Sequence, residues 1–324
     1  MTTNSIVYVG TIGQGVWRSR DGGEVWERLR DELYSESDIR ALAVNPQNPR
    51  ILYAGTETGV YRTTDGGDNW TWLHSEMDAL TVWSLAVHPT RPETIFAGTR
   101  PSAVYRSDDA GATWRKLPVG VETVCPPIHF TRVTTVLVDP TDPRTIWAGV
   151  EIDGVYRSVD GGESWTSHKT GLNSMDIHGL TILPGPPKRI LATTNAGLCA
   201  SEDNGETWMD LEIHTRFPWH YCRGITQKAD GSGTVFIGNG SGPPGDGGSI
   251  QLTEDGGRTW QQATLSHEPN STIWHFATNP DDPNLLFAYT ISGQIFRSVD
   301  GGASWTKLKR EFGEVRAMAW VHGD

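Results

Sequence analysis

A motif of eight residues, Ser/Thr-x-Asp-x-Gly-x-x-Trp, occurs seven times in this chain without an exception. It accounts for half of the 14 tryptophans. Its copies begin at Ser19, Thr63, Ser107, Ser158, Ser201, Thr253 and Ser298. A motif that returns along a whole chain indicates a repeat architecture, in which each repeat is one supersecondary unit packed against its neighbours.

The residue types of the motif are those of a tight turn between two strands. An Asp side chain accepts hydrogen bonds from backbone N–H groups across the turn, and Gly tolerates the positive φ that such a turn requires. The Trp supplies a large apolar ring that can cover the hairpin. We therefore expect a structural role for the seven aspartates, which are Asp21, Asp65, Asp109, Asp160, Asp203, Asp255 and Asp300.

Short strand-like runs flank each motif. Around the second copy they lie at residues 59–63 and 70–73. Two further runs, at 82–87 and 94–98, precede the third copy. A Pro-rich turn separates the two runs of that pair. Four strands in a unit of roughly 45 residues are typical of one blade of a β-propeller.

The ends of the chain complement each other. The chain begins with a second strand at residues 6–10 and ends with an unpartnered first strand at 315–321. Pairing these two runs closes a ring and leaves no free sheet edge. The sequence therefore predicts an all-β fold, with residues 1–324 forming a single seven-bladed β-propeller of four-stranded blades, closed by the C-terminal strand joining the N-terminal blade.

The seven motifs resemble the Asp-box of the BNR-repeat, sialidase-like propellers, and the resemblance extends over nearly the whole chain. Sialidases have six blades and an early Phe/Tyr-Arg-Ile-Pro segment, which this sequence lacks, so the resemblance does not imply sialidase activity. Xyloglucan-active glycosidases pair two seven-bladed Asp-box rings across a cleft. Photosystem II stability/assembly factors are similar single rings with an arginine patch and no enzymatic activity. The resemblance thus implies either a hydrolase-like protein or an assembly factor.

Composition narrows the classes of partner. The chain has 27 basic and 39 acidic side chains, a formal net charge of −12. Duplex DNA and anionic membranes need broad basic surfaces, so we expect neither as a partner. The N-terminal residues lack the charged and apolar regions of a secretory signal, and no stretch approaches the apolar length of a membrane span. We expect a cytoplasmic monomer.

No residue pattern indicates a metal or a cofactor. The three cysteines, Cys125, Cys199 and Cys222, are too few and too irregularly spaced for a disulfide framework or a metal site. The ten histidines are scattered, and neither an HExxH nor an EF-hand motif is present. We therefore expect no metal and no cofactor.

One column of residues near the start of the seven inner strands differs from the small and apolar residues that follow it. It consists of Arg40, Trp83, Thr134, His178, Arg223, Trp274 and Arg316. A second column, two residues earlier, consists of Asp38, Thr81, Arg132, Asp176, Tyr221, Thr272 and Glu314. The predicted ligand-binding residues are Arg40, Trp83, Arg132, Arg223, Trp274 and Arg316.

Two interpretations of the arginines stay open. Several guanidinium groups at one channel mouth repel each other unless negative charge lies among them. Acidic neighbours in the second column can supply that charge as an internal ion-pair network. A bound carboxylate or phosphate can supply it too, because the guanidinium fork matches both. The tryptophans favour a ring-bearing ligand beside the fixed charges.

Candidates for proton transfer lie near the same columns. They are His178, His275, Tyr221, Asp176 and Glu151, and the sequence does not rank them. The Gly/Pro-rich segment 239–248 is either a mobile lid or a tolerated surface loop. The sequence thus supports two hypotheses about function. The first is binding, or conversion by a hydrolase- or lyase-like reaction, of an anionic, ring-containing small molecule at the channel mouth. The second is a non-enzymatic protein-binding or assembly factor.

Overall fold

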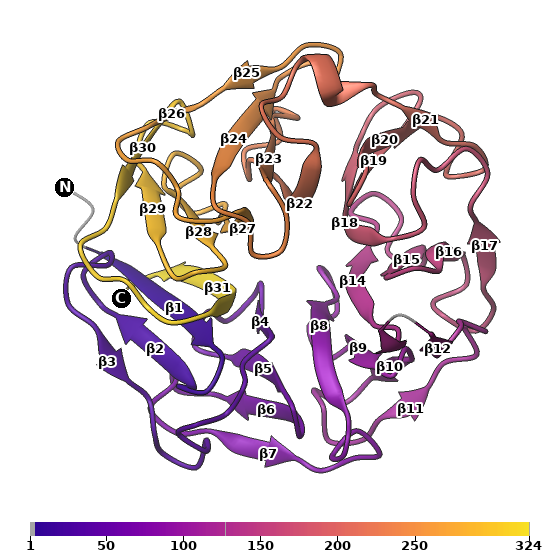
Figure 1. The fold of residues 1–324 in the computed structure, drawn as a ribbon. Coiled ribbons are helices and arrows are strands. Elements are labelled where there is room, and N and C mark those ends of the chain that lie inside the picture. The colour runs from indigo at the N-terminus through magenta and orange to yellow at the C-terminus, as the bar shows by residue number, and fades with distance from the viewer. Residues whose placement is uncertain (1–3, 127, 324) are drawn as a thin grey trace.

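A computed structural model describes residues 4–126 and 128–323. Seven antiparallel sheets stand around a central axis like the blades of a propeller (Figure 1). Blade 1 joins both ends of the chain and consists, from the axis outward, of β31 (Val315–His322), β1 (Ser5–Thr11), β2 (Val16–Ser19) and β3 (Glu27–Arg28). The predicted fold class and the predicted number of blades are confirmed.

Blades 2 to 4 each consist of four strands that are consecutive in the chain, with the first strand innermost. Blade 2 contains β4 (Ala41–Val44), β5 (Leu52–Thr56), β6 (Gly59–Thr63) and β7 (Thr71–Leu73). Blade 3 contains β8 (Thr81–Val87), β9 (Ile95–Arg100), β10 (Val104–Ser107) and β11 (Arg115–Lys116). Blade 4 contains β14 (Val133–Val138), β15 (Ile146–Val150), β16 (Gly154–Ser158) and β17 (Thr166–His168).

Blades 5 to 7 continue the same order. Blade 5 contains β18 (Ile177–Leu183), β19 (Arg189–Thr194), β20 (Gly197–Ser201) and β21 (Met209–Asp210). Blade 6 contains β22 (Tyr221–Gln227), β23 (Val235–Gly240), β24 (Gly248–Thr253) and β25 (Gln261–Gln262). Blade 7 contains β27 (Ile273–Ala277), β28 (Leu286–Thr290), β29 (Ile295–Ser298) and β30 (Ser304–Lys307).

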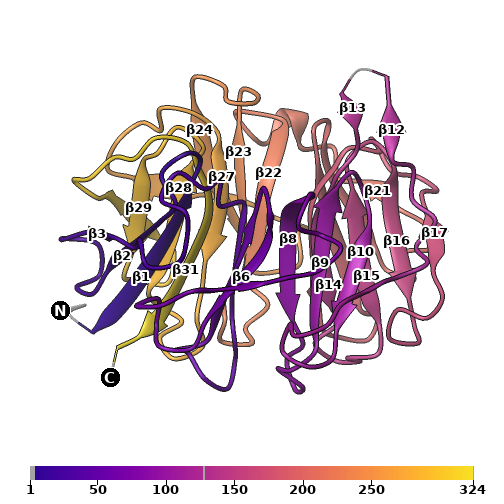
Figure 2. The ribbon, with the colours of Figure 1, turned by 90° about the horizontal axis from the view of Figure 1, so that it is seen from below.

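Three short elements add to the four-stranded pattern. Strand β26 (Thr264–Leu265) pairs in parallel with β30, so blade 7 has five strands. Strands β12 (Val124–Cys125) and β13 (His129–Phe130) form a ribbon that stands out from one end of the ring, on the side away from both termini (Figure 2). The 3-10 helix η1 (Ile213–Thr215) lies between blades 5 and 6. Within the described residues, no helix is long and apolar enough to cross a membrane.

Strand β31 closes the ring as predicted. It pairs antiparallel with β1 from Ser5 opposite His322 to Thr11 opposite Val315. Apolar side chains fill the wedge between neighbouring blades. Between blades 6 and 7, for example, Phe236 packs against Phe276 and Trp305, with ring centroids about 6 Å apart. Each blade thus buries one face against the blade before it and the other against the blade after it.

The last motif shows how the box turn is held. Ser298 Oγ donates a hydrogen bond to Asp300 Oδ1 (2.8 Å) and accepts one from the Gly302 N–H (2.9 Å). The N–H and hydroxyl of Ser304 donate to the two oxygens of the same carboxylate, at 3.0 and 2.6 Å. Trp305 Nε1 donates to Gly302 O at 2.9 Å. The Asp side chain therefore takes up donors that the turn leaves without backbone partners.

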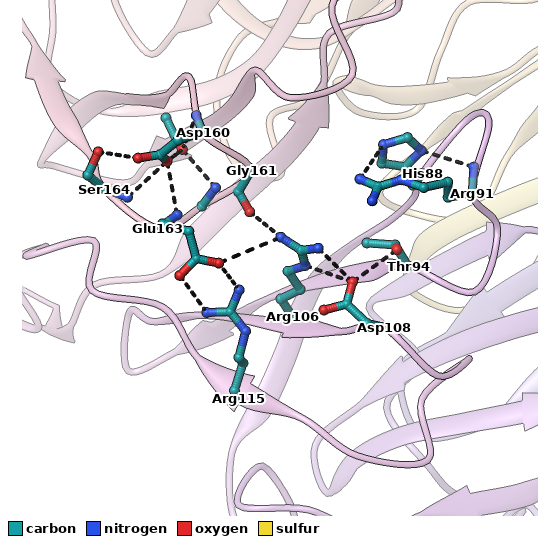
Figure 3. Close-up of polar contacts among 12 residues, drawn as sticks. His88, Arg91, Thr94, Arg106, Asp108, Arg115, Asp160, Gly161, Glu163 and Ser164 are labelled. Carbon is teal, nitrogen blue, oxygen red and sulfur yellow. Dashed lines mark hydrogen bonds and ion pairs between the residues drawn. The ribbon is translucent and has the colours of Figure 1, made fainter.

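An arginine of the third strand connects most blades to the box of the next blade. In blade 3, Arg106 donates to the carbonyl of Gly161, the residue after the box Asp of blade 4, at 2.5 Å (Figure 3). The same contact recurs as Arg18 to Gly66, Arg62 to Ala110, Arg157 to Asn204 and Arg297 to Gly22. The last of these connects blade 7 to blade 1 and so contributes to ring closure. Ala110 and Asn204 adopt a positive φ, of 59° and 58°, where the other boxes have Gly.

Two blade junctions lack this arginine. The equivalent third-strand positions are Ala200 in blade 5 and Leu252 in blade 6. Two other side chains lie beside the next boxes instead. Arg189, in the second strand of blade 5, lies beside Gly256, and Lys228, in the turn before the second strand of blade 6, lies beside Gly301. Both are engaged in ion pairs within their own blades, Arg189 with Glu202 and Lys228 with Asp230.

We predict that Asp300→Ala lowers the free energy of unfolding by about 1–3 kcal/mol, because the donors of Ser298 and Ser304 lose their acceptor. Val299, in the same turn, is 58% exposed. Val299→Ala is the matched control and should change stability by about 0.5 kcal/mol or less. Guanidinium unfolding of the two variants and the wild type measures both effects. Equal stability of the two variants would contradict a structural role for the box Asp.

We also predict loss of stability in acid. The hydroxyl and N–H of Thr207 lower the pKa of Asp203 to about 2, and Asp65 and Asp255 likewise have a pKa of about 2. A carboxyl whose pKa is lower in the folded state stabilises the fold above its unfolded pKa of about 3.9, and that contribution is lost as the pH falls through the folded pKa. The guanidinium chloride concentration at which half of the protein is unfolded should decrease as the pH is lowered from about 4 to about 2 at constant ionic strength. A midpoint that stays constant over this interval would contradict the prediction.

Candidate functional site

A β-bulge interrupts six of the seven inner strands near the start of the strand. Each bulge places one extra residue opposite the second strand of its blade, as the register shifts in these pairs show. The residues at the bulges are Trp83, Thr134, His178, Arg223, Trp274 and Arg316. In blade 2, Arg40 directly precedes β4 and donates its N–H to Gly55 O. A bulge redirects the side chain of its extra residue, and these side chains surround the channel.

A cavity of about 370 Å³ occupies the centre of the ring. All seven residues of the first sequence column line it, together with small and apolar residues of the inner strands and Tyr289 of β28. Tyr289 was not among the expected residues, because it comes from a second strand. Its hydroxyl donates to Arg316 O at 2.7 Å, so it supports the backbone of the bulge in β31.

The two tryptophans of the cavity wall lie against guanidinium groups. The Arg40 and Arg132 guanidiniums lie 4.6 and 4.3 Å from the ring centroid of Trp83. Trp83 is 9% exposed and Trp274 is 7% exposed. Little ring surface is therefore left for a ligand, and the tryptophans act mainly as cation–π partners of the arginines.

Three of the four arginines at the mouth have carboxylate partners. Arg40 pairs with Asp38 (3.0 Å), and Arg316 pairs with Glu314 (2.5 Å). The arrangement is bidentate for Arg132 and Glu151. The internal ion-pair network that the sequence left open thus accounts for these three arginines, and Glu151 serves as a partner of Arg132.

Arg223 differs from the other three. Among the described residues, no hydrogen bond or ion pair reaches its guanidinium, which lies 4.2 Å from the ring centroid of Trp274. The residue is 7% exposed and lines the cavity. Burial lowers the pKa of Arg223, as do the charges of Arg132 and Arg316, whereas Tyr221 and Asp176 act in the opposite direction. The guanidinium nitrogens are not among the fully buried atoms that lack a partner, so they reach the open space of the cavity. Arg223 is thus the arginine of this mouth whose charge has no direct carboxylate partner among the described residues.

His178, Asp176 and Tyr221 form a compact group beside Arg223. The His178 side chain is 1% exposed, and its Nδ1 lies 2.6 Å from Cys222 O, so Nδ1 donates there. Its Nε2 lies 3.4 Å from Asp176 Oδ2, and its ring centroid lies 4.8 Å from that of Tyr221. Burial lowers the pKa of His178, and the positive charge of Arg223 adds to that effect. This group connects blades 5 and 6.

His275 lies apart from that group. It follows the bulge of β27, is exposed to the channel and accepts a hydrogen bond from the Phe276 N–H at Nδ1 (2.8 Å). Desolvation at the wall of the channel lowers the pKa of His275, and the charge of Arg223 acts in the same direction. The structure therefore places one predicted histidine in a buried contact between blades and the other on the channel wall.

The Gly/Pro-rich segment forms the connection between β23 and β24. In this segment the Gly242 carbonyl accepts a hydrogen bond from the Thr272 hydroxyl (2.5 Å), and the Pro244 carbonyl accepts one from the Thr272 N–H (2.9 Å). Ser241 Oγ donates to Asp246 Oδ1 (2.6 Å) within the segment. These contacts attach the segment to the start of β27. Within the described residues, no group of His, Cys, Asp and Glu side chains has the arrangement of a metal site.

Comparison with curated proteins finds xyloglucanases. The chain is 25% identical over 347 aligned positions to a xyloglucanase of a Paenibacillus species, covering 94% of this chain and 30% of that protein. It is 24% identical over 246 positions to a xyloglucanase of Acetivibrio thermocellus, covering 64% and 28%. The chain thus spans less than a third of the length of these curated relatives.

Solved structures show the same fold. A GH74 xyloglucanase from Xanthomonas campestris superposes with a TM-score of 0.68 at 18% identity, covering 95% of this chain and 53% of that chain. The structure described as YCF48 bound to D1 peptide superposes with a TM-score of 0.65 at 18% identity, covering 92% of both chains. At these identities the likeness shows the fold alone.

Sequence comparisons also find sortilin, and they identify the family. Sortilin of Danio rerio is 30% identical over 129 positions, covering 38% of this chain and 15% of that protein. The family model Sortilin-Vps10, described as sortilin, neurotensin receptor 3, matches residues 14–125 and 197–323. The matched residues include most of the Asp-box repeats and make up more than half of the sequence. The chain belongs to the Sortilin-Vps10 family of Asp-box β-propellers.

Proposed function

We propose that this propeller binds a carboxylate-bearing ligand at the mouth of its central channel, with Arg223 as the anchor. The observation that carries the proposal is the Arg223 guanidinium, which faces the cavity from a largely buried residue and meets no carboxylate or other acceptor among the described residues. A guanidinium presents two parallel N–H donors that match a carboxylate. A bound carboxylate would supply the missing acceptors.

The cavity suits a small, ring-containing anion. Its volume of about 370 Å³ falls within the range of small-molecule sites. Its wall contains the hydroxyl of Thr226, and the hydroxyl oxygens of Ser84 and Thr134 line it as acceptors, since their hydrogens are donated to Val133 O and Ile177 O. Phe276 and Met318 add apolar surface. Since the tryptophan rings are covered by arginines, the ligand ring would lie deeper, against these inner-strand side chains.

The geometry supports binding more strongly than conversion. Hydrolysis of a glycosidic bond uses two carboxyl groups, one of which must donate a proton. Glu151 is occupied by both donors of Arg132, and Asp176 faces His178. The xyloglucanase relatives, moreover, are more than three times as long as the part that this chain spans.

A protein partner is the second candidate function. It is favoured by the YCF48 structure, which contains D1 peptide and superposes on this chain over 92% of both chains. For a single ring, a chain matched over 92% of its length is a more direct comparison than one matched over 53%. In this alternative the exposed apolar side chains of the projecting β12–β13 ribbon, Val124 and Phe130, would contact the partner (Figure 2).

We predict that Arg223→Met weakens carboxylate binding by about 10- to 100-fold, because a charge-assisted hydrogen-bond pair contributes about 1.5–3 kcal/mol. Arg40→Met is the matched control: it removes an arginine of the same mouth that already has a carboxylate partner. Its effect on affinity should be several-fold smaller. Isothermal calorimetry with glucuronate and benzoate measures the affinities, after a thermal-shift screen in which a ligand at 100 times its Kd adds about 2.7 kcal/mol of stability.

The screen also contains inorganic phosphate, a neutral xyloglucan oligosaccharide and a D1 peptide. Stabilisation by the carboxylates that disappears in Arg223→Met supports the proposal. Stabilisation by the neutral oligosaccharide, equal in wild type and variant, would contradict it and support a glycan site. Stabilisation by the peptide alone would support the second candidate.

A further inference from the structure

The orientation of Arg223 depends on contacts of its backbone. The guanidinium has no hydrogen bond among the described residues and lies over the ring of Trp274, on the side of blade 7. The backbone conformation of a residue sets the direction of its Cα–Cβ bond and the rotamers that its side chain can adopt. The groups that hold the main chain at residues 222–224 therefore help to determine which part of the cavity the guanidinium reaches.

Two side chains of blade 5 fix that main chain. His178 Nδ1 donates to Cys222 O at 2.6 Å, and Thr193 Oγ1 donates to Arg223 O at 2.9 Å. His178 and Thr193 are both buried, and in such a low-dielectric environment their hydrogen bonds to the two carbonyls are stronger than they would be in water. Two successive carbonyls of the bulge are thus held by the neighbouring blade.

Blade 7 closes the other side of the bulge. The ladder of β22 and β23 breaks between Cys222 opposite Asn239 and Ile225 opposite Ile237, which leaves Arg223 and Gly224 in the bulge. A Cβ on Gly224 would lie 2.7 Å from the Cα of His275, so the backbone of β27 is in direct contact there. The bulge is therefore held between two donors on one side and a strand on the other.

We propose that His178 and Thr193 are positioning residues for Arg223, and that they hold its bulge so that the guanidinium points into the cavity. This inference rests on the proposed function, since it assigns the support of the same anchor. Related contacts connect other blades, with Ser84 donating to Val133 O (2.9 Å) and Thr134 to Ile177 O (2.6 Å). Blade 6, which carries Arg223, receives two such contacts.

Substitutions of His178 separate the hydrogen bond from the packing. His178→Leu fills a similar volume without a donor, whereas His178→Asn keeps an N–H donor close to the position of Nδ1. The Nε–Hε resonance of Arg223 reports its position, because a ring at 4.2 Å shifts it. This resonance is assigned by its absence in Arg223→Lys. We expect it to move toward the value of a free arginine in His178→Leu and to stay near the wild-type value in His178→Asn.

Affinity for glucuronate is the second measurement. We expect about tenfold weaker binding in His178→Leu and near wild-type binding in His178→Asn, because only the former loses the donor to Cys222 O. Thr193→Val provides an independent variant with the same expected direction. Its control is Thr56→Val, which removes a buried hydroxyl that donates to Gly59 O in blade 2, away from Arg223.

The two measurements distinguish two kinds of failure. An unshifted Arg223 resonance and unchanged affinity in folded His178→Leu and Thr193→Val would overturn the positioning role. A loss of equal size in Thr56→Val would overturn it as well, since the effect would then be one of general stability. If wild-type protein binds no glucuronate while the resonance moves as expected, the positioning role is supported and the proposed carboxylate function is not.

Discussion

At five of its seven junctions the ring is held by one recurring contact: an arginine of a third strand donates to a turn carbonyl of the following blade. That carbonyl can accept the bond because the box turn holds it at a positive φ, as at Gly66 and Gly161. The box Asp in turn fixes the turn by accepting its free donors. The local turn and the assembly of the blades are therefore one system, in which a defect in the turn also weakens the joint to the preceding blade.

Much of this architecture is contained in the repeat itself. Seven boxes, the flanking strand runs and the complementary chain ends predicted the number of blades and the closure of the ring by β31. The alignment of inner strands also gave the column from Arg40 to Arg316, and all seven of its residues line the central cavity. Strand β26 was not predicted, because two residues of an irregular connection carry no period of their own.

The bulges were not predicted either, although they decide where the column residues point. A bulge is a difference in count between two paired strands, so it becomes visible only when the register is known. For the same reason the sequence left the arginines undecided. It placed acidic residues such as Asp38, Glu314 and Glu151 nearby. Only the distances show that these carboxylates pair with Arg40, Arg316 and Arg132, respectively. Among the described residues, Arg223 has no such partner.

The two junctions without a third-strand arginine lie on either side of blade 6, at Ala200 and at Leu252. Blade 6 is instead joined to blade 5 near the channel, where His178 and Thr193 donate to two successive carbonyls of its first strand. The connection between these two blades therefore lies at the inner strands, beside Arg223, and not in an arginine bond to the outer box turn. A load on this part of the ring is thus carried at the channel wall itself.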